Sequence, residues 1–362
     1  MTKSYNLWLA NVPGISIMKA SALLNYFTTA QGIYEASQKS LYTTGLPQKL
    51  IDTILAAKKI APEQYADILS KKDIKFVDLY DYDYPSLLKE IPEPPLGLYI
   101  KGSMPTTNAI SIVGSRKCTE YGMLTAVKMS KYLADCGISI VSGMARGIDS
   151  FAHKGALEAN GHTVAVLGCG VDICYPSENR SLYEKILKTG TIISEYFPGV
   201  PPKTHHFPLR NRIISGLSLA VLVVEAGKSS GSLITADKAL DQGRDVFAVP
   251  GNITSSLSLG TNNLIKEGAT LITHPEEIIE FLGLERELLR KKPKKAENNT
   301  PPLAPEEKLV YDYIVAQETA PVTVDEIIAK IDIPIPQVNY ALTMLELNEL
   351  VERLPGGRYT KK

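Results

Sequence analysis

The chain has 362 residues, of which 44% are hydrophobic and 22% are charged, as in globular proteins that bury a core. This length exceeds that of one ordinary domain, so two or three domains are expected. Lysine plus arginine and aspartate plus glutamate each total 39, which excludes a uniformly basic protein. A surface for nucleic acid would therefore need local segregation of charge.

No stretch of the sequence is apolar for long enough to span a membrane, and the first residues show no signal-peptide pattern. We therefore expect a cytoplasmic protein that does not contact a membrane. The four cysteines are scattered without the paired spacing of a zinc site or a disulfide framework: Cys118, Cys136, Cys169 and Cys174. The sequence predicts no metal site and four reduced thiols.

Residues 1–72 are expected to form a helical domain, with helix cores at 7–10, 19–27 and 48–57. The turn at residues 12–16 resembles that of a helix-hairpin-helix, in which backbone amides touch a DNA phosphate. Glycine at Gly14 permits the positive φ of a tight turn, but Ser16 occupies the place of the usual second glycine. A module that only packs helices together is the alternative.

Residues 73–285 alternate short β-rich segments with helical segments, which predicts an α/β domain with a doubly wound, mostly parallel sheet. Several strands are apolar almost throughout, as expected for strands covered by helices on both faces. The expected strands lie at 109–113, 138–141, 163–167, 191–193, 219–224, 245–249 and 269–272. Amphipathic segments at 124–133, 152–158 and 233–240 are expected to be helices between them.

Residues 286–304 are rich in cations and proline and are expected to be a linker. The tail, residues 305–362, reads as three helices at 306–316, 324–331 and 336–347, followed by a hairpin that turns at Gly356-Gly357. Three helices and a hairpin are the layout of a winged helix.

Small and cationic residues follow the expected strands. In an open parallel sheet, ligands bind beyond the carboxyl ends of the strands, where helix N-termini and backbone amides converge. The glycines and serines let a backbone approach a phosphate, and the arginine fork suits its oxygens. These segments are Gly114-Ser115-Arg116, Ser142-Gly143 with Arg146, and Ser230-Gly231-Ser232.

A second cationic segment, residues 203–212, contains Lys203, Phe207, Arg210, Asn211 and Arg212. Cations beside an aromatic ring suit a groove that follows a nucleic-acid backbone and stacks its bases. Two structural readings stay open, since Phe207 fits a core position equally well and Arg212 fits an ion pair with an acid such as Glu225.

Ordered motifs across residues 80–275 are similar to those of the DprA/Smf family: Tyr84-Pro85-Ser86-Leu87-Leu88, Ile112-Val113-Gly114-Ser115-Arg116, Ser142-Gly143-Met144-Ala145-Arg146-Gly147-Ile148-Asp149, Tyr175-Pro176, Phe207-Pro208-Leu209-Arg210-Asn211-Arg212, Ser230-Gly231-Ser232-Leu233-Ile234-Thr235-Ala236, and Gly260-Thr261-Asn262-Asn263. The resemblance implies a Rossmann-like domain that binds single-stranded DNA as a homodimer, and a role in protecting DNA during natural transformation and loading RecA on it. It implies no cofactor and no catalytic residue.

Carried over residue by residue, the resemblance makes Arg116 a DNA contact, and it adds Lys203 and the aromatic Phe207. The complete set of expected DNA-binding residues is Gly114, Ser115, Arg116, Ser142, Gly143, Arg146, Lys203, Phe207, Arg210, Asn211, Arg212, Ser230, Gly231 and Ser232.

The main alternative is a nucleotide-binding or nucleotide-hydrolysing enzyme related to the phosphoribohydrolases that resemble lysine decarboxylases. Glu225 and Arg146 would then be catalytic, with residues 229–232 as the phosphate loop. The Pro-Gly-Gly-x-Gly-Thr loop of those enzymes is absent, as are the Gly-x-Gly-x-x-Gly of dehydrogenases and the Walker motif of ATPases.

The tail differs in charge from a typical duplex-binding winged helix. Residues 305–362 carry six lysines and arginines against ten acids, and the expected recognition helix at 336–347 has no cation. Because affinity for duplex DNA depends heavily on cations against phosphate, we expect this domain to touch protein, or DNA only weakly through its wing.

Overall fold

The computed structural model describes residues 2–104, 108–284, 303–317, 321–331, 333–348, 350–354 and 357–361. Contacts divide the chain into two units, Met1–Leu289 and Arg290–Lys362, which are considered separately. The expected linker lies outside the described residues except for its last two residues. Gly356 of the expected hairpin turn also lies outside them. The described part of the chain contains no helix long and apolar enough to cross a membrane.

The first unit begins with six helices that have a hydrophobic core of their own, containing Trp8, Leu23 and Ile54. Side-chain oxygens of Ser16, Thr29 and Ser37 cap three of the helices and satisfy amides that lack an intrahelical partner. The helices are α1 (Thr2–Ala10), α2 (Ile17–Phe27), α3 (Ala30–Glu35), α4 (Gln38–Tyr42), α5 (Gln48–Ala57) and α6 (Pro62–Lys71). The three helix cores expected in this region are confirmed, and the domain boundary at 72/73 stays a prediction within the first unit.

The turn between α1 and α2 has Gly14 at φ 75°, a conformation that favours glycine. Ser16 is the N-cap of α2 and accepts from the Lys19 amide at 3.4 Å. Lys19 also donates its ammonium to the Gly14 carbonyl at 2.8 Å. The geometry gives Ser16 and Lys19 structural roles, and phosphate binding by this turn stays a prediction.

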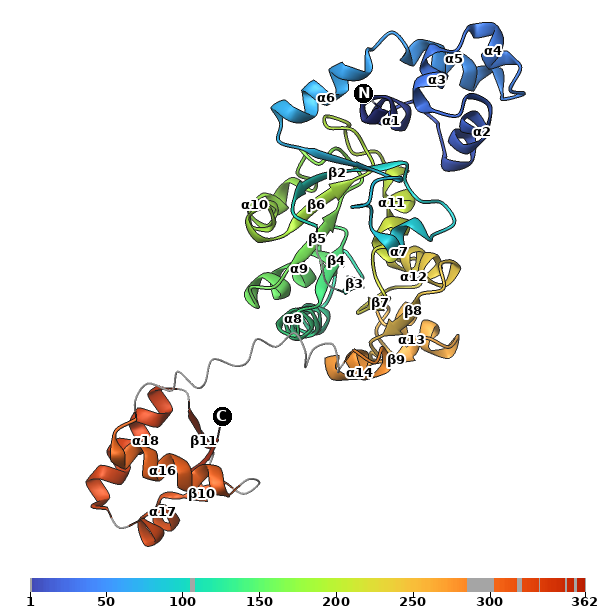
Figure 1. Cartoon of the computed structure of the whole chain (residues 1–362). Helices are drawn as coiled ribbons and strands as arrows, with labels where there is room; N and C mark the ends of the chain where they lie inside the picture. The colour runs from blue at the N-terminus through green and yellow to red at the C-terminus, as the bar shows by residue number, and fades with distance from the viewer. Residues whose placement is uncertain are drawn as a thin grey trace. The chain divides into compact units, whose positions relative to one another are not determined.

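Nine strands of the first unit, within its described residues, form one sheet in the order β1-β2-β6-β5-β4-β3-β7-β8-β9 (Figure 1). The seven strands from β6 to β9 are parallel, whereas β1 and β2 are antiparallel additions at one edge. The strands are β1 (Lys75–Asp78), β2 (Gly97–Gly102), β3 (Ala109–Val113), β4 (Ser139–Ser142), β5 (Thr163–Val166), β6 (Thr191–Ser194), β7 (Ala220–Val223), β8 (Asp245–Ala248) and β9 (Thr270–Leu271).

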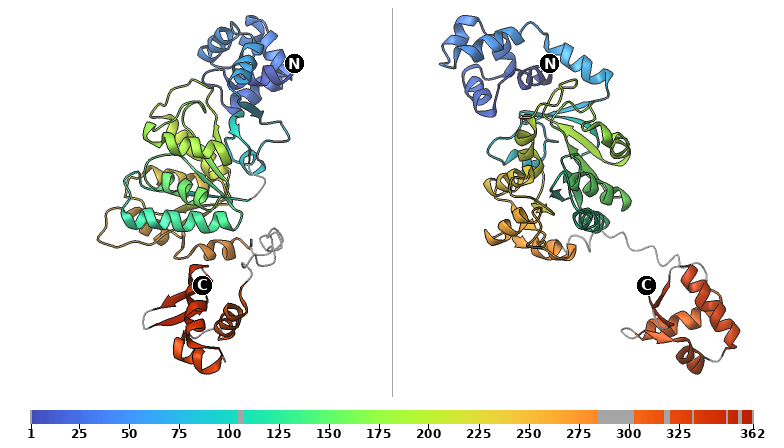
Figure 2. Two further views of the ribbon diagram at one scale, coloured as in Figure 1. Left: turned by 90° about the vertical axis from the view of Figure 1, so that its left-hand side faces the viewer. Right: turned by 180° about the vertical axis from the view of Figure 1, so that it is seen from behind.

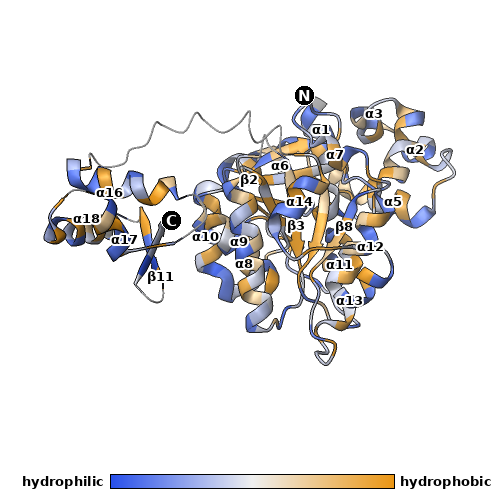
Figure 3. Ribbon diagram, turned by 90° about the horizontal axis from the view of Figure 1, so that it is seen from below, coloured by the Kyte–Doolittle hydropathy of each residue, from blue (hydrophilic) through white to orange (hydrophobic). Residues whose placement is uncertain are grey.

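Helices cover both faces of the sheet, as the two side views show (Figure 2). The central strands are fully buried and hydrophobic, and they lie between helices with polar outer surfaces (Figure 3). One core cluster packs the sheet against α7 (Ser86–Lys89), α11 (His206–Gly216), α12 (Gly231–Asp241) and α13 (Leu259–Lys266). Other clusters pack it against α8 (Glu120–Asp135), α9 (Ile148–Glu158), α10 (Arg180–Thr189) and α14 (Pro275–Phe281). A short 3-10 helix, η1 (Ser177–Asn179), precedes α10.

The doubly wound, mostly parallel sheet expected from the sequence is confirmed. All seven expected strands are present, and no strand end differs from its expected position by more than one residue. The sequence analysis did not identify β1 and β2 as strands. It assigned neither a helix nor a strand to residues 203–212, most of which form the start of α11.

The second unit is the winged helix that the sequence predicts. Its helices are α16 (Pro305–Ala316), α17 (Val324–Lys330) and α18 (Ile335–Leu347), and its strands are β10 (Val322–Thr323), β11 (Val351–Leu354) and β12 (Arg358–Lys361). The strands pair in the order β10-β12-β11. Val310, Ile327 and Leu345 are buried in a core of this unit's own.

Candidate nucleic-acid interface

An open cavity of about 710 Å³ lies where the carboxyl ends of the central parallel strands meet the N-termini of α9, α11 and α12. Three segments that are far apart in the sequence form its wall: Gly114-Ser115-Arg116 after β3, Phe207 to Asn211 on α11, and Ser229 to Ser232 at the start of α12. The sheet topology therefore brings together three of the motifs that the sequence analysis selected. This is the edge at which open α/β sheets bind ligands.

The rim of this cavity consists of Arg116, Tyr175 and Phe207. The Tyr175 and Phe207 rings are stacked, with centroids 5.4 Å apart and an interplanar angle of 28°. The Arg116 guanidinium carbon lies 5.7 Å from the centroid of the Phe207 ring, within the range of a cation–π contact. Arg116 is exposed, Tyr175 is 43% exposed and Phe207 is half-buried, so two rings and a guanidinium face solvent together.

The loop that carries Arg116 is held on both sides. The Ser115 amide donates to the Glu225 carbonyl at 2.7 Å, and the Ser115 carbonyl accepts from the Ile148 amide at 3.1 Å. Gly147, at φ 72°, passes so close to this loop that an added Cβ would lie 2.2 Å from the Ser115 carbonyl oxygen. Further along, the Thr119 amide and hydroxyl donate to the Glu225 carboxylate at 2.8 and 2.7 Å. Arg116 therefore projects from a fixed backbone.

The floor of the cavity consists of Asp149, Arg210 and Asn211, all buried. Arg210 is only 4% exposed and donates to the carbonyls of Gly143, at 2.8 Å, and Val166. Its Nε also donates to the Asn211 side chain at 3.3 Å. These bonds join the carboxyl ends of β4 and β5 to α11. The structure thus gives Arg210 a structural role, and a direct phosphate contact by this residue stays a prediction.

Burial changes the titration of the groups in and beneath the floor. Burial raises the pKa of the Asp149 carboxyl, while Arg210 and the amides of Ala145 and Gly143 act in the opposite direction. Burial also lowers the pKa of Arg210 to about 10, so it remains a cation at neutral pH. Beneath the floor, burial and then Arg210 lower the pKa of His153 to about 3. Its Nδ1 contacts the Thr163 hydroxyl at 2.7 Å, and among the described residues its Nε2 has no partner.

The small residues of the site leave room for this framework. An added Cβ on Gly143 would lie 2.6 Å from an Arg210 nitrogen and 2.8 Å from an Asp149 oxygen. The Ser142 hydroxyl is buried and donates to the Ile112 carbonyl at 2.7 Å, which joins β4 to β3. Gly143 and Ser142 therefore lie behind the cavity surface.

The start of α12 contributes the remaining polar wall. Ser230 is the N-cap of α12 and accepts from the Ser232 amide at 3.4 Å. The Asn211 amide group donates to the Gly231 carbonyl at 3.2 Å, which links α11 to this helix start. Ser230, Gly231 and Ser232 line the cavity, as expected for residues that would contact a phosphate.

Besides Ser142 and Gly143, three more expected contacts lie outside the cavity lining: Arg146, Lys203 and Arg212. Arg146 is exposed and pairs with Glu178, with its Nε 3.0 Å from the carboxylate. Arg212 forms an ion pair with Glu195 at 2.6 Å, so its partner is Glu195 and not the Glu225 suggested as an alternative. Lys203 is exposed directly before Thr204, which does line the cavity, and a DNA contact by the lysine stays a prediction.

The structure also adds residues that the sequence analysis did not select. Tyr175 lines the cavity and belongs to the rim, and Lys117 adds a second exposed cation beside Arg116. Tyr175 belongs to the Tyr175-Pro176 family motif in the segment between β5 and η1, and an aromatic residue in a connection that follows a parallel strand is the signal that could have selected it. Among the described residues, no group of three or more His, Cys, Asp or Glu side chains could hold a metal ion.

The residues proposed for the enzymatic alternative do not meet. Glu225 is 3% exposed and its carboxylate is bonded to Thr119, in the wall of a separate cavity. Arg146 pairs with Glu178 and lines neither the candidate interface nor the cavity that contains Glu225. This separation gives no support to a shared catalytic centre.

The fold and the cavity together define a class of protein: a Rossmann-like domain whose strand ends carry a small-residue, arginine and aromatic site, followed by a winged helix. Comparison with known protein families shows which family within this class the chain matches. Residues 75–283 match the family described as DNA recombination-mediator protein A, and residues 294–357 match the DprA winged helix domain. The chain belongs to the DNA recombination-mediator protein A family, DprA/Smf.

Comparison with individual proteins leads to the same family. The chain is 35% identical to Protein Smf of Synechocystis sp., over 98% of both chains. The solved structure of DNA processing protein A from Streptococcus pneumoniae is 34% identical, with a TM-score of 0.66 that covers 76% of this chain and 97% of the other. The Helicobacter pylori DNA processing protein A, whose structure is described in terms of its single-stranded DNA binding mode, is 29% identical, with a TM-score of 0.53 over 58% of this chain and 96% of the other.

Proposed function

We propose that this chain binds single-stranded DNA without sequence specificity, with the rim and the neighbouring cations as its contact surface. The observation that carries the proposal is the stack of Tyr175, Phe207 and Arg116 at the edge of an open cavity. Aromatic rings stack on any base, and a guanidinium fork binds phosphate oxygens, so the surface suits a flexible strand whose bases are accessible. The single-stranded DNA named for the Helicobacter pylori relative supports the same proposal.

Within recombination, we propose that the protein acts as a homodimer that protects the strand and loads RecA on it, as in natural transformation. This part rests on membership of the family and carries no catalytic step. Light scattering of the full chain tests the dimer. Assembly of RecA on DNA coated with single-strand-binding protein, measured with and without this chain, tests the loading.

The DNA proposal is tested by fluorescence anisotropy with a labelled single strand and with the matching duplex across a salt series. Arg116→Ala and Lys203→Ala should each weaken binding of the single strand by about 1–3 kcal/mol, because a charged hydrogen bond is lost. The salt slope should fall by about 0.7 for each phosphate contact removed.

Lys128→Ala is the matched control, since it removes an exposed cation from the surface of α8, and the lining of the cavity contains no residue of α8. Its affinity should equal that of the wild type. Binding that all three variants retain unchanged would place the DNA elsewhere on the protein.

A further inference from the structure

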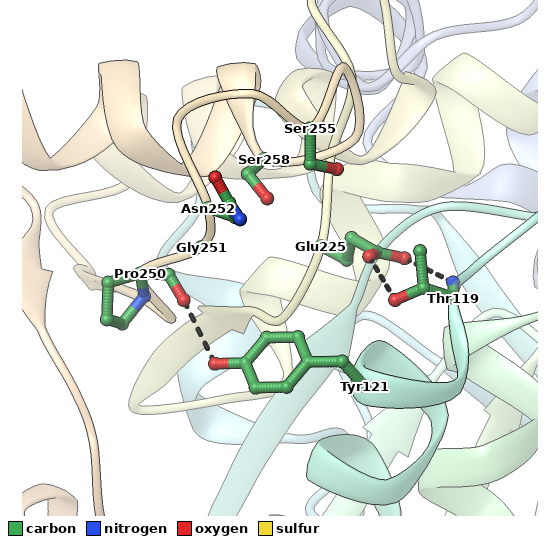
Figure 4. A pocket seen from close by; sticks show the side chains of 8 residues that line it. All are labelled: Thr119, Tyr121, Glu225, Pro250, Gly251, Asn252, Ser255 and Ser258. Carbon is green, nitrogen blue, oxygen red and sulfur yellow. Dashed lines mark hydrogen bonds between the residues drawn. The ribbon is translucent and has the colours of Figure 1, made fainter.

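A second open cavity has a volume of about 670 Å³, and Figure 4 shows the residues that line it. The same two loops line both cavities. The loop after β3 contributes Lys117 to the first cavity and Thr119 to the second, and the loop before α13 contributes Leu257 to the first and Ser258 to the second. The two cavities are therefore lined by residues that are one or two positions apart in each loop.

The second cavity differs from the first in charge. Its lining contains no lysine or arginine among the described residues, and the Glu225 carboxylate lies in its wall. A carboxylate in a lining that contains no cation disfavours phosphate at that place. Each Glu225 oxygen accepts one bond from Thr119 and keeps further lone-pair capacity, so the cavity offers an acceptor to an uncharged ligand that can donate.

Other polar groups converge on the same space. Among the described residues the hydroxyls of Ser255 and Ser258 have no hydrogen-bond partner. The Asn252 side-chain oxygen accepts from the Thr254 amide at 3.0 Å, which fixes the orientation of this amide and leaves its nitrogen as a donor. Donors and acceptors gathered on one side of a cavity match the hydrogen-bonding edge of a heterocycle.

An aromatic ring completes the second cavity. Tyr121 is 52% exposed, and its hydroxyl donates to the Pro250 carbonyl at 3.0 Å, which holds the ring in place. Figure 4 shows Tyr121 on one side of the space, and Asn252, Ser255 and Ser258 on the other. A fixed ring facing polar groups is the arrangement that stacks a planar base and contacts its edge.

We propose that this second cavity is a subsite for one nucleobase of the bound strand, and that it favours a base with an exocyclic amino group over thymine. The inference rests on the proposed function and deepens it. An amino group such as cytosine N4 donates to a glutamate carboxylate, whereas the thymine carbonyl at the same position is repelled by it. A preference at one nucleotide leaves the rest of the strand free of sequence requirements.

The test compares binding of oligo-dC and oligo-dT of equal length, at a pH of about 8 where cytosine N3 is unprotonated, by the full chain and two variants. Ser255→Phe fills the second cavity, and Ser256→Phe places the same ring on the adjacent exposed residue that does not line it. The wild type and Ser256→Phe should bind oligo-dC about fivefold more tightly than oligo-dT, the effect of about one hydrogen bond. Ser255→Phe should bind the two equally.

If Ser255→Phe does not fold, as judged by thermal melting, Tyr121→Leu provides the second variant. Loss of the stacking ring should weaken oligo-dC binding about fivefold or more. The subsite is overturned if the wild type binds oligo-dC and oligo-dT with equal affinity. It is also overturned if neither Ser255→Phe nor Tyr121→Leu changes the ratio of the two affinities. If Arg116→Ala still loses binding of both oligonucleotides in that case, the proposed function stands without the subsite. If the wild type binds neither oligonucleotide, the proposed function itself fails.

Discussion

The rim and the floor of the candidate interface each contain one arginine, but the two arginines have different surroundings and different partners. On the rim, the Arg116 guanidinium is exposed over an aromatic ring and has donors to offer to a ligand. In the floor, the Arg210 guanidinium is 4% exposed and its donors are bonded to carbonyls at the ends of β4 and β5. An arginine in a motif can therefore serve the ligand or the fold, and burial distinguishes the two roles.

The largest expected difference between the two layers is in stability. Arg210→Ala should lower the free energy of unfolding by about 3–5 kcal/mol, because it leaves buried carbonyls without donors and Asp149 without its cation. Arg116→Ala should change it by less than about 0.5 kcal/mol. Urea denaturation of both variants measures this. An equal loss in the free energy of unfolding in the two variants would show that Arg116 supports the fold as much as Arg210 does.

His153, beneath the floor, should make the free energy of unfolding depend on pH by about 2 kcal/mol. Its pKa is about 3 when folded, against about 6.5 when unfolded, so between these values the unfolded state binds the extra proton. Stability from this group is present above pH ~6.5 and is lost as the pH falls. The opposite contribution of Asp149, whose pKa is raised, is present in both proteins and cancels in their difference.

When the pH is lowered from ~7 to ~5, the free energy of unfolding should therefore fall by about 2 kcal/mol less in His153→Leu than in the wild type. Urea denaturation at the two pH values gives the comparison. Parallel pH profiles for the two proteins would mean that His153 takes up its proton in the folded state as readily as in the unfolded chain.

A smaller effect, of about 1–2 kcal/mol on binding of a single strand, is expected for Tyr175→Ala, since one stacking ring is lost from the rim. The folded state should be little affected, because Tyr175 is 43% exposed. Tyr82→Ala is the control, since that ring is fully exposed and does not line the cavity. Fluorescence anisotropy with a labelled oligonucleotide should show a lower affinity for Tyr175→Ala than for either the control or the wild type.

The smallest expected effect concerns DNA binding by the winged helix, whose sequence is acidic overall. Residues 305–362 carry four more acids than cations, and α18 contains no lysine or arginine. The fragment 303–362 has its own core and should show no measurable duplex binding at physiological salt. Measurable duplex binding by this fragment would contradict the expectation that the domain mainly contacts protein.

The parallel sheet could be predicted because its strands are apolar runs flanked by glycine and small polar residues. The strands β1 and β2 were harder, because Lys75–Asp78 is four residues long with a charged residue at each end, and β2 ends in Lys101-Gly102. The pairing of β1 with β2, and of β2 with β6, depends on contacts between segments distant in the sequence, which no local pattern encodes.

Within the site, the residues of the wall could be predicted, but not which side chains point into the fold. The segment from His206 to Arg212 has no clear apolar period, so its helical start and the inward direction of Arg210 were not visible in the sequence. The same holds for the partner of Arg212, since Glu195 and Glu225 follow different strands and only the strand order brings Glu195 near.

The bonds from Glu225 to both ends of the Ser115–Thr119 loop also bear on the kinetics of binding. A loop that is already fixed loses little conformational entropy when a ligand arrives, so Arg116 is preorganised for its contact. Association then needs no folding step, and its rate should follow electrostatic steering by the exposed cations. Added salt should accordingly slow the capture of a strand.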